Sequence, residues 1–212
     1  ARRIDIFLIE REQSVLSKLV AIEGATQEES FEVQTKVRVD GIEPILANLE
    51  TLPVEILYRR RYHEFDTYFH FDDPGQGRLR YREDEYLDES GQMTNVRYRL
   101  TLIGPAREGR FAGDVLLSRS RYLAPATHSL RFYREYFKPA GETAIEKERR
   151  RWRVLYKGTE FYINLDQIKQ PELGTFVEVK SRTWSRKDAE LKSELSRELL
   201  ARLVGEAGQA LG

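Results

Sequence analysis

Alternation of charged and apolar residues with a period of two is the feature that most constrains how this chain folds. Successive side chains of a β-strand point to opposite faces, so each such segment predicts a strand with one charged and one largely apolar face. The charged or polar members of the pattern are Glu32, Gln34, Lys36, Arg38, Arg80, Arg82, Lys147, Arg149, Arg151, Arg153, Glu178, Lys180 and Arg182. We expect these strands to close into a barrel with the apolar faces outside. The charged faces would then line a tunnel for a strongly anionic ligand.

Net charge argues against a polyanion-binding surface that covers the whole chain. The 212 residues include 35 acidic and 35 basic side chains, so the formal net charge is zero. An anion site must therefore come from local clustering of basic residues. Because the basic residues of the strands are predicted to point inward, we do not expect nucleic acid as a partner.

Cysteine is absent, which excludes disulfides, thiol nucleophiles and metal sites built on thiolates. No apolar run approaches the roughly 18 residues of a membrane span, and no signal-peptide pattern is present. We therefore predict a cytoplasmic protein without a membrane partner. The three histidines, His63, His70 and His128, do not have the spacing of metal ligands.

Periodicity and turn residues predict about eight strands and a few helices. The predicted strands include 31–39, 58–71, 77–83, 95–103, 144–156, 160–166 and 174–183. Helices are predicted at 12–22, 41–52, 125–137 and 187–211, and the last carries an apolar stripe of Leu191, Leu195, Leu199, Leu203 and Ala207. For residues 116–123 a helix and an extended segment are both compatible with the sequence.

Six segments, in order along the chain, carry a resemblance to a known family. They are Glu32-Val33-Gln34-Thr35-Lys36, Asp66-Thr67-Tyr68-Phe69, Leu79-Arg80-Tyr81-Arg82, Leu100-Thr101-Leu102-Ile103-Gly104-Pro105, Lys147-Glu148-Arg149-Arg150-Arg151-Trp152 and Leu165-Asp166 with Leu173-Gly174-Thr175-Phe176-Val177-Glu178-Val179-Lys180. In this order the chain resembles the CYTH family, the triphosphate tunnel metalloenzymes, from about residue 31 to 203. That family includes class IV adenylyl cyclases, thiamine triphosphatases and inorganic triphosphatases.

The resemblance implies an α+β, mainly β fold: a closed antiparallel eight-stranded β-barrel, or tunnel, with flanking helices. Residues 31–212 would form this domain. Residues 1–30 would be an N-terminal extension or the junction with an upstream domain to which the tunnel is fused.

Site residues follow from the resemblance position by position. Family carboxylates bind one or two divalent cations, which implies a metal set of Glu32, Asp166 and Glu178, with Glu32 and Glu178 as catalytic residues and Mg²⁺ or Mn²⁺ as cofactor. Family cations grip a triphosphate, which implies a substrate-binding set of Lys36, Arg80, Arg82, Arg99, Arg149, Arg151 and Lys180. Phosphoanhydride cleavage needs such a combination of hard cation and fixed positive groups.

Three departures from the family pattern weaken the metal site. Gln34 stands where the family has its second opening Glu, Lys180 where it has its last Glu, and Ile103 where it usually has Lys. Lys180 lies two residues from Glu178 on the same face, where it can pair with Glu178 or Glu32 and compete with a metal. Arg97 or Arg99 can supply the positive charge missing at Ile103.

These features lead to one prediction of function with two alternatives. The first is metal-dependent hydrolysis of a phosphoanhydride in an inorganic, organic or nucleoside triphosphate. The alternatives are a non-catalytic module that binds polyphosphate or nucleotide with a degraded metal site, and a class IV-type adenylyl cyclase. Taken singly, each pattern also fits a solvated strand face or a basic edge strand; their joint order favours the tunnel.

Overall fold

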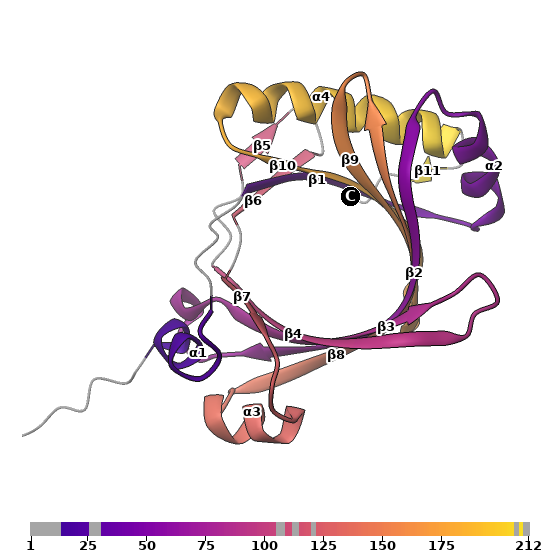
Figure 1. Cartoon of the computed structure of the whole chain (residues 1–212). Coiled ribbons are helices and arrows are strands. Elements are labelled where there is room, and N and C mark those ends of the chain that lie inside the picture. The colour runs from indigo at the N-terminus through magenta and orange to yellow at the C-terminus, as the bar shows by residue number, and fades with distance from the viewer. Residues whose placement is uncertain are drawn as a thin grey trace, which may run out of the picture.

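The strands of this protein form one antiparallel sheet (Figure 1). The computed structural model describes residues 14–25, 31–104, 109–111, 115–119, 122–205 and 208–209. Eight strands have five residues or more: β1 (Phe31–Val39), β2 (Glu55–His70), β3 (Arg78–Leu87), β4 (Met93–Ile103), β6 (Val115–Arg119), β8 (Gly141–Tyr156), β9 (Thr159–Gln170) and β10 (Gly174–Thr183). Three are shorter: β5 (Gly109–Phe111), β7 (Tyr122–Pro125) and β11 (Gly208–Gln209).

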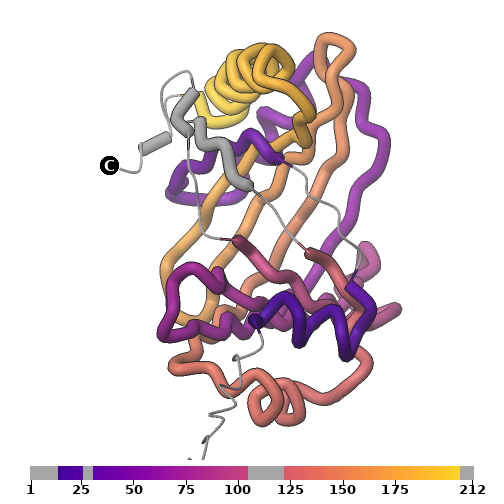
Figure 2. The backbone as a smooth tube through the Cα atoms, turned by 90° about the vertical axis from the view of Figure 1, so that its left-hand side faces the viewer, coloured from indigo at the N-terminus to yellow at the C-terminus, as the bar shows by residue number. Residues whose placement is uncertain are grey.

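The backbone of the sheet curls around a central axis, as Figure 1 shows end-on and Figure 2 from the side. Its strand order is β5-β6-β1-β10-β9-β8-β2-β3-β4-β7, with β11 paired to β1. Within the described part of the chain, no hydrogen-bonded ladder joins the β5–β6 end to β7. The antiparallel, mainly β fold with helices is therefore confirmed, whereas full closure of the barrel stays a prediction.

Four helices of the described chain lie on the outside of the curved sheet (Figure 1). They are α1 (Val15–Glu23), α2 (Glu43–Thr51), α3 (Leu130–Phe137) and α4 (Arg186–Val204). The apolar strand faces pack against them, so the core lies outside the ring and the charged faces point inward. None of the described helices combines the length and the apolar character needed to span a membrane.

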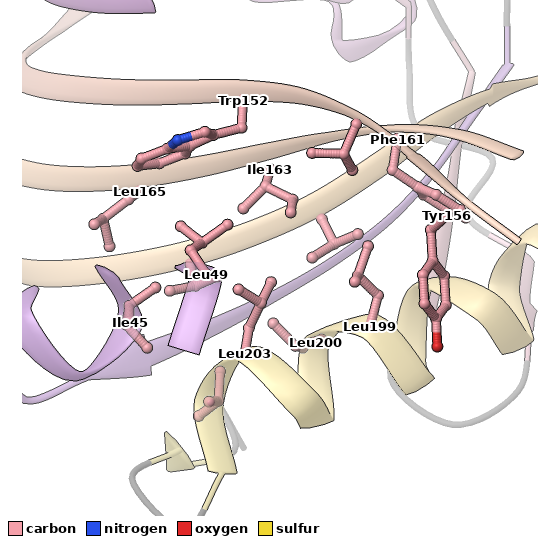
Figure 3. Close-up of a cluster of buried hydrophobic side chains, with 14 of the residues drawn as sticks. Ile45, Leu49, Trp152, Tyr156, Phe161, Ile163, Leu165, Leu199, Leu200 and Leu203 are labelled. Carbon is pink, nitrogen blue, oxygen red and sulfur yellow. The ribbon is translucent and has the colours of Figure 1, made fainter. Parts of the chain in front are cut away.

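Two apolar clusters hold the helices on the sheet. The first joins α2 and α4 to the outer faces of β8, β9 and β10, with Trp152, Phe161, Ile163, Leu199 and Leu203 among its buried members (Figure 3). The second joins α1 and α3 to β2, β3 and β4, and it buries Leu19, Phe69, Leu79, Leu100 and Tyr133. The strands are thus anchored on both sides of the ring, which fixes the directions of their inward side chains.

Three sequence predictions are corrected or decided by the structure. The helix predicted at 125–137 begins only at Leu130, because residues 122–125 form β7 and Ser129 caps the helix. The last helix ends at Val204, before Gly205 at φ 54°, and Leu191 of its predicted stripe is 52% exposed. Residues 115–119 and 122–125 are extended. Ala207 lies outside the described residues, as do residues 1–13 and 26–30 of the predicted N-terminal extension.

Candidate functional site

The inward strand faces enclose a cavity of about 380 Å³. Its size falls in the range of ligand sites, roughly 300–1,000 Å³. Its charged lining comes from six strands and consists of Glu32, Lys36, Arg80, Arg82, Arg99, Lys147, Arg149, Arg151, Asp166, Glu178, Lys180 and Arg182. Polar and aromatic groups complete it, among them Gln34, Tyr58, Tyr68, Thr101 and Tyr162. All ten residues that the sequence predicted as catalytic, substrate-binding or metal-binding therefore lie around one cavity, while their roles stay predictions.

Strand register places a buried ion-pair cluster along β2, β3, β4, β8 and β9. Asp66 lies opposite Arg82, and Asp166 opposite Arg149. Arg82 contacts both oxygens of Asp66 through Nε and Nη2, at 2.5 and 2.6 Å. Arg149 contacts both oxygens of Asp166 in the same manner, at 2.6 Å each. These bidentate contacts hold the guanidinium planes in fixed orientations.

Glu64 is the centre of this cluster. Its Oε2 lies 3.1 Å from Arg82 Nη1 and 3.1 Å from Lys147 Nζ, and its Oε1 lies 3.3 Å from Arg149 Nη1. Lys147 also contacts Asp66 at 3.2 Å. We name the buried ion-pair cluster as the set Glu64, Asp66, Asp84, Asp166, Arg82, Arg99, Lys147 and Arg149, in which Arg99 pairs with Asp84.

The electrostatics of the cluster follow from its cations. Burial alone would raise the pKa of Glu64, but Arg149, Arg82 and Lys147 outweigh that cost and hold the pKa well below its usual value. Burial likewise opposes ionisation of Asp66, and the charge and hydrogen bonds of Arg82 lower its pKa. Both carboxylates therefore stay ionised at neutral pH and keep the surrounding cations in place.

Sequence reasoning missed Glu64 and Asp84 and gave Asp66 no role in the site. The local signal was present: Tyr62, Glu64, Asp66 and Tyr68 share one strand parity, as the inward residues of the other strands do. Their partners lie on strands distant in sequence, so the pairing depends on register, which the sequence alone does not display.

Several other cations of the cavity are not paired so closely with carboxylates of the described chain. Among the described residues, no carboxylate oxygen lies within 4.0 Å of Lys36, Arg151 or Arg182. Arg151 instead donates from Nε to Asn164 at 2.8 Å. Arg80 donates from Nη2 to Thr101 at 3.2 Å, and its buried Nε has no hydrogen-bond partner in the described chain. These groups retain donors for a ligand.

β1 and β10 carry the remaining two carboxylates of the lining, beside a lysine. Lys180 Nζ lies 3.5 Å from Glu32 Oε2 and 4.0 Å from Glu178 Oε1. Asn164 donates to Glu178 at 3.3 Å. Burial opposes ionisation of Glu178, but Lys180 and Arg149 lower its pKa. Burial also lowers the pKa of Lys180, although Glu32 and Glu178 act in the opposite direction.

The predicted metal set does not fit a divalent cation in this arrangement. Both oxygens of Asp166 contact Arg149, and the ammonium of Lys180 lies beside Glu32 and Glu178. Across the described residues, no group of three His, Asp or Glu side chains is placed to hold a metal. A hard cation requires several carboxylate or carbonyl oxygens at once, and these carboxylates face fixed positive groups instead.

The balance of charge defines what the cavity attracts. Among the residues that the structure describes, nine cationic and three anionic side chains line it. Glu64, Asp66 and Asp84 add three buried carboxylates beside the same cations, which leaves an excess of three positive charges. In a chain of zero net charge, this local excess of positive charge favours an anionic ligand in the cavity.

Comparison with solved structures identifies the fold. The PH1819 protein of Pyrococcus horikoshii OT3 superposes with a TM-score of 0.59 at 19% identity, over 85% of this chain and 94% of that chain. A proposed adenylate cyclase from Vibrio parahaemolyticus superposes with a TM-score of 0.56 at 15% identity, over 87% of this chain and 96% of that one. No protein-family model matches the sequence, and no curated protein matches it. Both likenesses concern the fold, and at that level they agree with the predicted resemblance to the CYTH family.

Proposed function

We propose that the protein binds a triphosphate chain in the tunnel, either inorganic triphosphate or the phosphate tail of a larger ligand. The observation that carries this proposal is the concentration of nine Lys and Arg side chains around one cavity. Fixed cations in a partly enclosed site bind phosphoryl oxygens far more strongly than the same charges in bulk water. A chain of three phosphates carries enough negative charge to meet several of them at once.

The cations divide into two groups with different tasks. The carboxylates of the buried ion-pair cluster hold Arg82, Lys147 and Arg149 in place. These cations therefore contribute positive potential to the cavity and define the shape of its wall. Fewer contacts within the described chain hold Arg80, Arg151 and Lys36. Arginine grips phosphate oxygens in pairs through its planar fork, and Arg80 and Arg151 are therefore the residues that we expect to contact the ligand directly.

Thermal unfolding with and without tripolyphosphate tests this proposal. At a ligand concentration of 100 times Kd, binding stabilises the folded state by about 2.7 kcal/mol. For a domain of this size the melting temperature rises by roughly 5–10 °C. Orthophosphate and sulfate serve as controls for general anion effects. The proposal is wrong if millimolar tripolyphosphate produces no shift beyond these controls, either with Mg²⁺ or with a chelator.

Metal-dependent phosphoanhydride hydrolysis is the second candidate function. The observation in its favour is that Glu32 and Glu178, on neighbouring strands, approach one point of the cavity wall. The lysine at that point is the observation against it. Release of phosphate from tripolyphosphate, pyrophosphate, ATP and thiamine triphosphate, measured with Mg²⁺ or Mn²⁺, decides between binding and hydrolysis. Formation of cyclic AMP from ATP in the same assay tests cyclisation.

A further inference from the structure

Strands β1 and β10 lie side by side (Figure 1), and their pairing brings one ammonium and two carboxylates together. In the strand register, Gln34 lies opposite Lys180 and Lys36 opposite Glu178. Lys180 Nζ approaches Glu32 at 3.5 Å and Glu178 at 4.0 Å. The Lys180 side chain is 19% exposed and the two carboxylates are each 14% exposed. The lysine is therefore held between them inside the wall.

We infer that the Lys180 ammonium replaces a divalent cation at this point of the wall, so that the tunnel binds its triphosphate ligand without metal. This inference rests on the proposed function, because it concerns how the same ligand is held. It assigns Lys180 to ligand binding and removes the predicted dependence on Mg²⁺ or Mn²⁺.

Competition for the same oxygens is the first argument. A divalent cation and an ammonium at Glu32 and Glu178 would repel each other at short range. Displacing Lys180 would leave a partly buried ammonium without its two carboxylates and close to other cations of the wall, which is costly. Asp166 offers no alternative, since Arg149 contacts both of its oxygens.

The donor inventory of lysine is the second argument. An ammonium has three N–H donors and no acceptor. Glu32 and Glu178 engage at most two of these donors, which leaves one for a phosphate oxygen. Lys180 also lines the cavity together with Arg149 and Arg151. It can therefore bridge the carboxylates of the wall and an anionic ligand, the bridging task that a bound metal performs in a phosphate site.

Calorimetry with tripolyphosphate tests the inference on the wild-type protein. The protein is stripped with chelator and titrated once in chelator and once with Mg²⁺, and the complex of Mg²⁺ with free ligand is subtracted through a protein-free titration. We expect affinities that agree within about threefold. Binding only in the presence of metal would overturn the inference but leave the proposed function intact. Absence of binding in both titrations would overturn the proposed function as well.

Electron paramagnetic resonance of Mn²⁺ gives a readout that needs neither ligand nor turnover. We expect the wild-type protein to leave Mn²⁺ free at micromolar concentrations. The double variant Gln34→Glu/Lys180→Glu should bind it, because it adds two carboxylates and removes the competing ammonium. Tight Mn²⁺ binding by the wild-type protein would contradict the inference even if tripolyphosphate does not bind.

Substitution of the lysine completes the test. Lys180→Met should weaken metal-free tripolyphosphate binding by about 10-fold to 100-fold, the usual loss for a charge-assisted contact. Lys187→Met, at an exposed position of α4, is the charge-matched control and should bind as the wild type does. Circular dichroism verifies that each variant is folded. Unchanged affinity of folded Lys180→Met would show that Lys180 does not contact the ligand.

Discussion

The two sides of the tunnel wall treat their cations differently. On the side of β2, β3 and β8, buried carboxylates lie within 4.0 Å of three cations: three carboxylates around Arg82, and two each around Lys147 and Arg149. On the side of β1 and β10, Lys180 lies between two carboxylates, while Lys36 and Arg182 have none within that distance among the described residues. The first side holds its cations in fixed ion pairs, and the second leaves Lys36 and Arg182 without a carboxylate partner in the described chain, so that their charge is available to an anionic ligand.

This difference separates stability from binding. A buried cation that has lost its carboxylate destabilises the fold strongly, so the paired side must be kept intact for the protein to fold. Cations with spare donors repel one another until an anion arrives, so they favour binding at some cost in stability. Variants of the cations paired with carboxylates and variants of the cations with spare donors should therefore affect different measurements.

Removal of the central carboxylate should give the largest effect. Glu64→Gln keeps the shape of the side chain but leaves Arg82, Lys147 and Arg149 with one negative charge fewer. We expect the free energy of unfolding to fall by about 3–5 kcal/mol, measured by denaturant titration. Glu89→Gln, at an exposed position, should change it by less than about 0.5 kcal/mol. Equal stability of the two variants would mean that the cluster does not hold the wall.

Acid should remove from the wild-type protein the stabilisation that the ionised Glu64 provides. The folded state holds the pKa of Glu64 well below its usual value, so the stabilisation is complete above the unfolded pKa of about 4.3. It is lost as the pH falls towards the folded pKa, by roughly 1.4 kcal/mol for each pH unit below 4.3. The difference in unfolding free energy between the wild type and Glu64→Gln should therefore shrink as the pH falls from about 5 to about 3, the range on either side of that pKa. A difference that stays constant over this range would show that the loss does not come from the charge of Glu64.

Arg80 and Arg82 provide the sharpest contrast because they lie two residues apart on β3. Arg82→Ala removes the partner of Asp66 and should mainly reduce stability. Arg80→Ala should mainly reduce tripolyphosphate affinity, by about 1.5–3 kcal/mol, since the nearest carboxylate oxygen lies 3.9 Å away and its Nε has no partner in the described chain. Calorimetry and thermal melts on both variants measure the two effects. Equal loss of stability in both would contradict the division.

The inward faces of this tunnel were predictable from sequence, whereas the ion pairs were not. Alternation is local, so Glu32 and Lys36 on β1, or Arg149 and Arg151 on β8, show their common face within a few residues. Pairing is not local: Glu64 and Lys147 meet only because β2 and β8 pair in a particular register. The same limit applies to the predicted metal set, because the pattern displays Asp166 without Arg149, its neighbour across the β8–β9 ladder.

The sequence pattern also did not predict the end of the last helix or the short strands. The apolar spacing of α4 continues to Leu211, but the chain leaves the helix at Gly205 and forms β11 at 208–209. The segment 115–125 lacks long alternation, and pairing with β1 and β4 makes its described strands extended. In both cases tertiary contacts decide what local preference leaves open.

The rim of the tunnel should show the smallest effect. Arg182 is an exposed cation near the end of β10 and lines the cavity from its edge. Because water and salt screen it, Arg182→Ala should cost about 0.2–1 kcal/mol of tripolyphosphate affinity, and this cost should shrink as NaCl shortens the screening length. The loss in Arg80→Ala should persist in salt, since Arg80 is largely buried. Arg131→Ala, on the exposed face of α3, is the control for overall charge. If Arg182→Ala instead matched Arg80→Ala and resisted salt, the ligand would lie at the rim, and the comparison between the two sides of the wall would have to be redrawn around that end of the tunnel.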